Sequence, residues 1–148
     1  MMIDKNLREF KRSLPMSLLR AREAVMKKFM PSLKEHGLSP QQWRVIRALQ
    51  EENGLDISEL SERCQLLMPS LSRIIQNLDS RKLVERQSVE SDQRRSAIFL
   101  TGSGRSLFDL VAPKSIERYN HITEKFGYGK LELLYDLLDE LVEKIEEE

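Results

Sequence analysis

The fold is decided by residues 55–100, which contain LDISEL at 55–60, MPSLSRIIQNL at 68–78, LVERQ at 83–87 and DQRRSAIFL at 92–100. The first two pieces predict a short helix, a turn and a second helix. The last two pieces predict a β-hairpin with a basic tip. This order is typical of a winged helix-turn-helix, which places one helix in the major groove of DNA.

The second predicted helix has two unlike faces. One face is an apolar stripe at i, i+3, i+4 and i+7, made by Leu71, Ile74, Ile75 and Leu78, and we expect it to pack on the first helix. The other face is either an ordinary solvated surface or a surface that binds DNA. The second interpretation is open because short polar groups and a guanidinium contact base edges and phosphates. On the second interpretation the DNA-binding residues are Pro69, Ser70, Ser72, Arg73, Gln76 and Asn77.

The predicted wing spans residues 83–100, with strands at 83–87 and 97–100 and a polar loop between them. Adjacent arginines on a loop suit a minor groove, whose negative potential attracts guanidinium groups. Residues 63–105 carry eight basic and four acidic side chains, so this part is +4 in a chain that is neutral overall. We therefore assign Arg86, Arg94 and Arg95 to DNA binding.

Three features together resemble the MarR family of bacterial transcription regulators: the helix-turn-helix, the wing sequence Asp92-x-Arg94-Arg95 and the following Leu100-Thr101-x-x-Gly104. The length and the flanking helices also fit, so the resemblance covers essentially the whole chain. It implies a homodimer that binds a pseudo-palindromic operator in double-stranded DNA. One departure is Lys82, because family members usually carry a left-handed glycine there. A lysine in that conformation costs about 1 kcal/mol, so we expect a remodelled helix end.

The chain ends predict helices that bring two copies together. Residues 1–36 carry net charge +5, and residues 129–148 carry −6, so opposite ends attract within one chain or between two. The last helix, expected from Lys130, has an apolar stripe close to a coiled-coil seam, made by Leu131, Leu134, Leu138, Leu141 and Ile145. That stripe packs on its own domain or forms a two-fold dimer, and we favour the dimer.

The expected fold is mainly α with a small β-hairpin wing. We predict a single domain over residues 1–148, in which 1–36 and 102–148 form a helical dimerisation region and 38–100 form the winged helix-turn-helix. A helix over 4–36 should be bent or divided at Pro15 and Pro31. A helix that Thr101 caps should run to about Phe126 and be interrupted and kinked at Pro113.

The composition predicts a cytoplasmic protein. The 148 residues are 40% apolar and 32% charged, which is ordinary for a soluble helical protein. We see no run of about 18 apolar residues that predicts a membrane span and no apolar h-region that predicts export. The single cysteine, Cys64, permits no internal disulfide.

Enzyme chemistry is not expected, and neither is a metal or cofactor. His36 and His121 lack the spacing of a metal site, and no phosphate-binding loop or hydrolase motif is present. Two alternatives to an effector-controlled DNA-binding regulator remain. One is a redox-responsive regulator that uses Cys64, which needs an accessible thiol of low pKa. The other is a winged-helix adaptor that binds proteins.

Within the family, LLRAREA at 18–24 and QQWR at 41–44 resemble the branch that controls degradation of homoprotocatechuate and related phenolic acids. The resemblance implies a repressor that a small aromatic acid releases from DNA. Such an effector needs a guanidinium for its carboxylate and apolar walls for its ring. The candidates are Arg20 or Arg22 for the carboxylate, and Met26, Met30, Trp43 and Ile46 for the ring. Alternatively, the arginines form surface ion pairs and Trp43 is a core residue.

Overall fold

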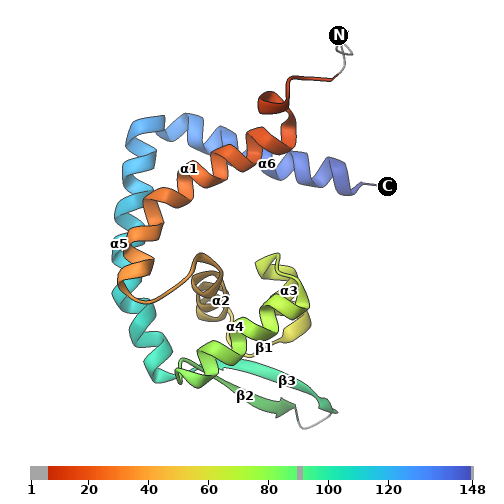
Figure 1. The fold of residues 1–148 in the computed structure, drawn as a ribbon, viewed down its shortest axis with the longest axis vertical. Coiled ribbons are helices and arrows are strands. Elements are labelled where there is room, and N and C mark those ends of the chain that lie inside the picture. The colour runs from red at the N-terminus through yellow and green to blue at the C-terminus, as the bar shows by residue number, and fades with distance from the viewer. Residues whose placement is uncertain (1–6, 90–91, 148) are drawn as a thin grey trace. The chain divides into compact units, whose positions relative to one another are not determined.

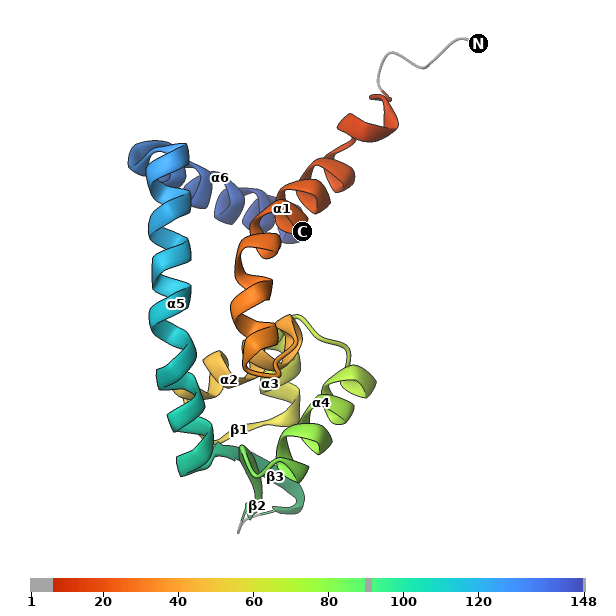
Figure 2. The same cartoon turned by 60° about the vertical axis from the view of Figure 1, so that its left-hand side comes forward.

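The computed structural model describes residues 7–89 and 92–147, although the side chains of residues 89–95 lie outside the description. The chain forms two compact units, residues 1–112 and 113–148, which we treat separately. The elements in chain order (Figures 1 and 2) are η1 (Phe10–Arg12), α1 (Leu14–Glu35), α2 (Pro40–Glu51), β1 (Leu55–Asp56), α3 (Ile57–Cys64), α4 (Met68–Ser80), β2 (Val84–Val89), β3 (Asp92–Leu100), α5 (Gly102–Phe126) and α6 (Tyr128–Glu146). The expected fold class, mainly α with a small wing, is confirmed.

The first long helix is divided near Pro15, as expected. Ser13 separates η1 from α1 and caps α1, because its Oγ accepts a hydrogen bond from Met16 N at 3.4 Å. Pro15 then occupies the first turn of α1, where its missing N–H breaks no helical bond. Pro31 lies inside α1 and does not end it.

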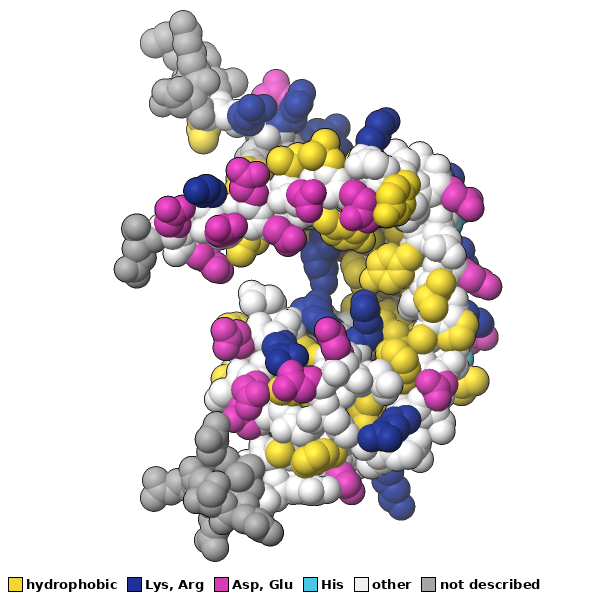
Figure 3. All heavy atoms as spheres, turned by 180° about the vertical axis from the view of Figure 1, so that it is seen from behind, with side chains coloured by type: hydrophobic (Ala, Val, Ile, Leu, Met, Phe, Trp, Pro, Cys, Tyr) yellow, Lys and Arg dark blue, Asp and Glu magenta, His cyan; other side chains and the backbone are white. Residues whose placement is uncertain are grey.

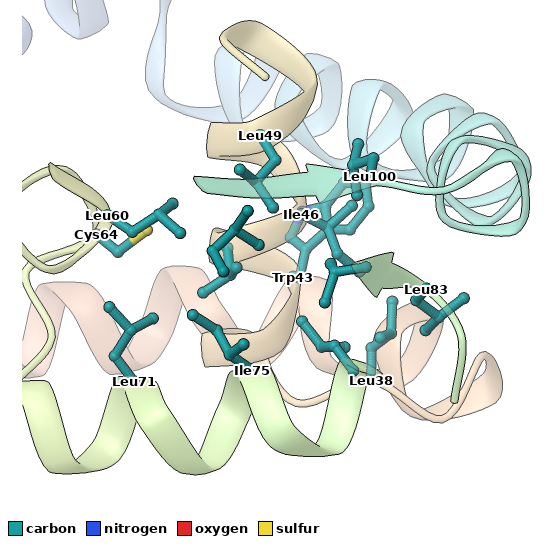
Figure 4. Packing of buried hydrophobic residues seen from close by; sticks show 14 of the residues in the cluster. Leu38, Trp43, Ile46, Leu49, Leu60, Cys64, Leu71, Ile75, Leu83 and Leu100 are labelled. Carbon is teal, nitrogen blue, oxygen red and sulfur yellow. The ribbon is translucent and has the colours of Figure 1, made fainter. Parts of the chain in front are cut away.

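The helix-turn-helix is built around one apolar cluster (Figure 4). From α4, Leu71, Ile75 and Leu78 point into this cluster and are fully buried. They meet side chains of α2 and α3, including Ile46 and Leu60. The expected packing of the apolar stripe is therefore confirmed, and it turns the polar positions of α4 outward.

The wing is longer than the sequence suggests, and it belongs to a sheet of three strands in the order β1-β3-β2. β2 pairs with β3 from Val84↔Leu100 to Val89↔Asp92, with an irregularity after Ser88. The short strand β1, which we did not predict, pairs Leu55 with Ile98. The expectation that residues 92–95 form a loop is wrong, because their backbone belongs to β3. Apart from Val89, the outer half of this hairpin is polar in sequence, so it lacks the alternation that identifies a strand.

The C-terminal end of α4 is not remodelled at Lys82, contrary to our expectation. Lys82 takes the left-handed conformation, with φ of 60°, that glycine adopts most readily. Lys82 N donates to Asp79 O and Leu83 N donates to Leu78 O, both at 2.9 Å. These two bonds make a Schellman motif, so the satisfied backbone carbonyls offset the strain of the lysine.

The second unit contains the end of α5 and the whole of α6. α5 runs through Pro113 as one helix, so the expected interruption is absent. A proline removes one backbone hydrogen bond, which a helix of 25 residues tolerates. Gly127, with φ of 108°, separates α5 from α6, which begins at Tyr128, two residues earlier than expected.

α6 has no buried residue in the described part of the chain. Acidic side chains gather along it (Figure 3). Its predicted stripe is partly shielded, since Leu131, Leu138 and Leu141 are half-buried. A second apolar set is exposed and was missed in the sequence: Leu133, Leu137 and Val142. The helix therefore presents more apolar surface than one narrow seam.

Candidate functional site

α4 presents its predicted DNA-binding side chains on the face opposite its buried stripe. Five of them are exposed and Ser72 is half-buried; the exposed ones are Pro69, Ser70, Arg73, Gln76 and Asn77. Their roles remain predictions, but their orientation is the one that those roles require. A helix whose inner face is anchored by Leu71 and Ile75 offers a rigid surface of donors and acceptors.

The N-terminus of α4 is open. Leu67 occupies the N-cap position and gives no side-chain hydrogen bond to the first turn. Leu67 itself is 79% exposed. The free N–H groups of a first turn carry a partial positive charge and bind anions such as phosphate oxygens.

Two hydrogen bonds tie α4 and its C-cap residue to the start of α2 and to the loop before it. Gln42 Nε2 donates to Asn77 Oδ1 at 3.0 Å, and Arg81 Nη1 donates to Gly37 O at 2.9 Å. Neither bond was predicted from the sequence. Residues 35 and 44 positions apart leave no signal in a single sequence. These two bonds add to the apolar cluster, which anchors the buried face of α4.

The wing arginines are described to different extents. Arg86 lies in β2 opposite Ile98 and is exposed. Arg94 and Arg95 belong to β3 by their backbone, and their side chains lie outside the described residues. Their assignment to a minor groove stays a prediction from the sequence.

The predicted effector cations lie on α1. Arg20 and Arg22 are both exposed. Arg22 Nη1 lies 3.4 Å from Glu23 Oε1, with the two side chains 50% and 57% exposed. An ion pair this open contributes little to stability, so Arg22 is not committed to it. Of the two methionines on the same helix, Met26 is half-buried and Met30 is exposed.

The predicted apolar walls from α2 lie in the core. Trp43 is 8% exposed and stacks on Phe108 of α5, with ring centroids 5.4 Å apart and an angle of 18° between the planes. Phe108 was not predicted as a partner of Trp43. Ile46 is fully buried in the main cluster, so its role as an effector wall stays a prediction. Arg47 lies one turn beyond Trp43 and is exposed. It was not predicted from the sequence as a candidate partner for the effector carboxylate.

An open pocket of about 620 Å³ lies elsewhere in the first unit, and none of the predicted effector residues line it. It joins the end of α4 to the start of α5, and its lining residues are Arg81, Leu83, Gly102, Ser103, Ser106, Leu107 and Leu110.

Cys64 has the properties of a core residue. Its side chain is buried in the main cluster, with Sγ 3.8 Å from Arg44 O. Burial raises the pKa of the thiol, although the nearby Arg44 guanidinium acts in the opposite direction. A peroxide sensor needs an accessible thiol with a lowered pKa. The environment of Cys64 therefore disfavours the redox alternative.

The same described residues show neither a metal site nor a membrane span. No group of three or more His, Cys, Asp or Glu side chains is positioned there to hold a metal ion. The described helices also include none with the length and apolar character needed to span a bilayer.

The chain matches known proteins along most of its length. Residues 36–95 match a family model described as MarR family. The HTH-type transcriptional regulator FarR of Neisseria gonorrhoeae is 41% identical over 135 residues, which are 91% of this chain and 92% of FarR. The homoprotocatechuate degradative operon repressor of Escherichia coli is 38% identical over 130 residues, which are 88% of each chain. The crystal structure of NadR in complex with 4-hydroxyphenylacetate gives a TM-score of 0.78 at 38% identity, covering 91% of this chain and 96% of that one.

Proposed function

The chain belongs to the MarR family, and from this premise we propose that it is a homodimeric repressor of transcription that binds double-stranded DNA and is released by a small aromatic carboxylic acid. The observation that carries the DNA-binding part is the outward polar face of α4, backed by a fully buried apolar face. The similarity to a degradative operon repressor supports repression. The similarity to NadR, solved with 4-hydroxyphenylacetate, supports an aromatic-acid effector.

In the proposed complex, α4 enters the major groove. Its exposed side chains, such as Ser70, Arg73 and Gln76, contact base edges and phosphates. The open N-terminus of α4 meets a phosphate. Arg86 with Arg94 and Arg95 brings positive charge from the wing to the flanking minor groove.

We propose that the dimer forms through residues 1–36 and 102–148. Both segments expose large apolar side chains in the single chain: Leu14, Leu18, Leu19 and Val25 in the first, and Leu133, Leu137, Val142 and Ile145 in the second. Large apolar side chains that a single chain leaves exposed on the same segment suit an interface with another chain. The opposite charges of the two chain ends favour the same association.

A two-fold dimer should select a pseudo-palindromic DNA sequence. The expected half-site centres lie about 10 base pairs apart, roughly one turn of the double helix, because two α4 helices read the same side of the duplex. Selection of binding sites from a pool of random duplexes, followed by sequencing, measures this spacing. Recovery of isolated half-sites with no symmetry would contradict the proposed dimer.

The proposed effector site uses Arg20 or Arg22 for the carboxylate. The ring contacts Met26, Met30, Trp43 and Ile46. The effector must bind the DNA-competent and released conformations with different affinity, because a ligand with equal affinity for both changes neither population. Release then follows when the favoured conformation sets the two α4 helices at a spacing that no longer matches the operator.

Replacement of Arg22 by alanine should abolish the response to an aromatic acid and leave DNA binding intact. The reason is that the carboxylate loses its guanidinium partner, whereas α4 is unchanged. Release of operator DNA by added 4-hydroxyphenylacetate measures the response. Lys27→Ala removes the same charge from another exposed position of α1 and is the control. An Arg22→Ala protein that still responds would remove Arg22 from the site and direct attention to Arg20 and Arg47.

The rival functions make different predictions. A winged-helix adaptor would bind no duplex in a salt-dependent manner, whereas a regulator's affinity falls steeply with salt. A redox regulator would lose its response to peroxide in Cys64→Ser. The burial and raised pKa of the Cys64 thiol disfavour this redox function. Since the relatives are transcription regulators, we also infer that the chain acts in the cytoplasm and catalyses no reaction.

A further inference from the structure

The side chain of Gln42 links the start of α2 to the outer face of α4. Its Oε1 accepts a hydrogen bond from Ser39 N at 2.9 Å, which completes the capping box of α2. Its Nε2 donates to Asn77 Oδ1 at 3.0 Å. Both ends of one amide are therefore occupied, one by a backbone group and one by a predicted DNA-binding residue.

The direction of this hydrogen-bond chain is fixed by the backbone. The N–H of Ser39 only donates, so it must face Oε1 of Gln42. The NH2 group of Gln42 is thereby turned toward Asn77, and an NH2 group also only donates. Asn77 must therefore accept this hydrogen bond with its carbonyl oxygen Oδ1. Its own NH2 group is consequently turned away from Gln42.

That NH2 group is free to meet DNA. Asn77 is exposed and lies seven residues after Ser70, two turns along the same side of α4. Within the described part of the chain, no acceptor is positioned to bind Asn77 Nδ2. The side chain therefore offers a donor outward while its acceptor is occupied.

We propose that Gln42 is a positioning residue, which fixes Asn77 as a hydrogen-bond donor toward DNA; the proposal rests on the function proposed above. A fixed donor meets an acceptor on the duplex: N7 of a purine, O6 of guanine, O4 of thymine, or a phosphate oxygen. The paired contact that asparagine makes to adenine needs a donor and an acceptor that both face the base, and it is not expected here because Oδ1 faces Gln42.

Gln42→Glu tests this inference by reversing the polarity. A glutamate at the same position still accepts the Ser39 N–H, and glutamate is a standard capping-box residue, so α2 should begin as before. The carboxylate has no hydrogen to give Asn77. The amide of Asn77 must then rotate by half a turn, so that its NH2 group donates to the glutamate. This rotation points Oδ1 of Asn77 at the duplex. A donor toward DNA becomes an acceptor.

Gln41→Glu is the matched control, because it adds the same charge at the neighbouring exposed position of α2. Affinity is measured at one salt concentration for the selected operator and for duplexes that carry each single-base change in the half-site. We expect Gln42→Glu to bind at least tenfold more weakly than Gln41→Glu, the loss typical of one well-placed contact. A change in base ranking at one position per half-site assigns the acceptor to a base; a uniform loss assigns it to phosphate.

Equal affinity and equal base ranking of the two glutamate variants would overturn the inference. If Gln42→Glu fails to fold, as judged by thermal unfolding beside Gln41→Glu, Asn77→Ala provides the second test. It removes the donor and leaves the capping box between Ser39 and Gln42 in place. It should cause the same loss, so wild-type affinity and ranking in Asn77→Ala would overturn the inference as well. If the wild-type protein binds no duplex, the proposed function itself is overturned. The binding assay on the wild type alone gives this result, so it is distinguishable from a failure of the inference.

Discussion

One methyl group added at Gly104 should lower the free energy of unfolding by about 3 kcal/mol. A Cβ at this position would lie 2.2 Å from Leu83 O and 3.0 Å from Leu100 Cδ2. The Leu83 carbonyl also accepts a hydrogen bond from Thr101 N at 3.1 Å, so it is held at the junction of the wing and α5. Because backbone cannot yield as a flexible side chain does, the added methyl must displace α5 or the strand ends.

Gly102→Ala is the matched control for Gly104→Ala. It changes the same residue type two positions earlier in α5, where a Cβ meets nothing within 4 Å. We expect its stability to equal or slightly exceed that of the wild type, because alanine favours a helix more than glycine does. Urea denaturation of both variants measures the difference. Equal stability of the two variants would show that the close packing of Gly104 on Leu83 does not constrain this junction.

Replacement of Arg94 by alanine should weaken operator binding by about 1–3 kcal/mol. The expected cause is the loss of a guanidinium from the minor groove, where the potential of the duplex is most negative. The backbone of Arg94 belongs to β3, which pairs with β2 to form the wing. A titration of the selected operator at fixed salt measures the effect.

The control for Arg94→Ala is Lys27→Ala, which removes one positive charge from an exposed position of α1. This variant tests whether any loss of positive charge weakens binding equally. We expect Lys27→Ala to bind within a factor of about two of the wild type, because exposed charges far from the duplex are screened by salt. Unchanged affinity in Arg94→Ala would remove the wing from the proposed interface.

Most of the fold could be predicted because its buried faces repeat along the sequence. The apolar spacing of α4 identified Leu71, Ile75 and Leu78 as core, and the structure buries all three. The outer half of the wing could not be predicted in the same way. Its sequence is polar at almost every position, so backbone pairing such as Ser88↔Ser96 leaves no apolar alternation to recognise.

Glycine-like conformations were harder to predict, because residue type does not determine them. Lys82 adopts a positive φ that a lysine rarely takes. The hydrogen bonds of the motif around it supply the compensation, and these depend on the helix before it and the strand after it. A rule based on residue type therefore predicted a remodelled end where none occurs.

The candidate site could be predicted for side chains that share one helix face. The polar positions of α4 follow from the apolar ones by helical geometry, so Ser70, Arg73 and Asn77 were found together. Contacts between distant segments had no such rule. The bond from Gln42 to Asn77 and the stack of Trp43 on Phe108 depend on how α2, α4 and α5 assemble.

If α4 and the wing bind the DNA backbone as proposed, the affinity of the chain for DNA must depend on salt. The affinity of the full chain for its selected operator is measured at several salt concentrations. If each dimer neutralises at least six phosphates, affinity should fall by roughly a thousandfold between 50 and 200 mM salt, linearly on logarithmic axes. An affinity that does not change over this range, or no binding to any duplex, would contradict the account.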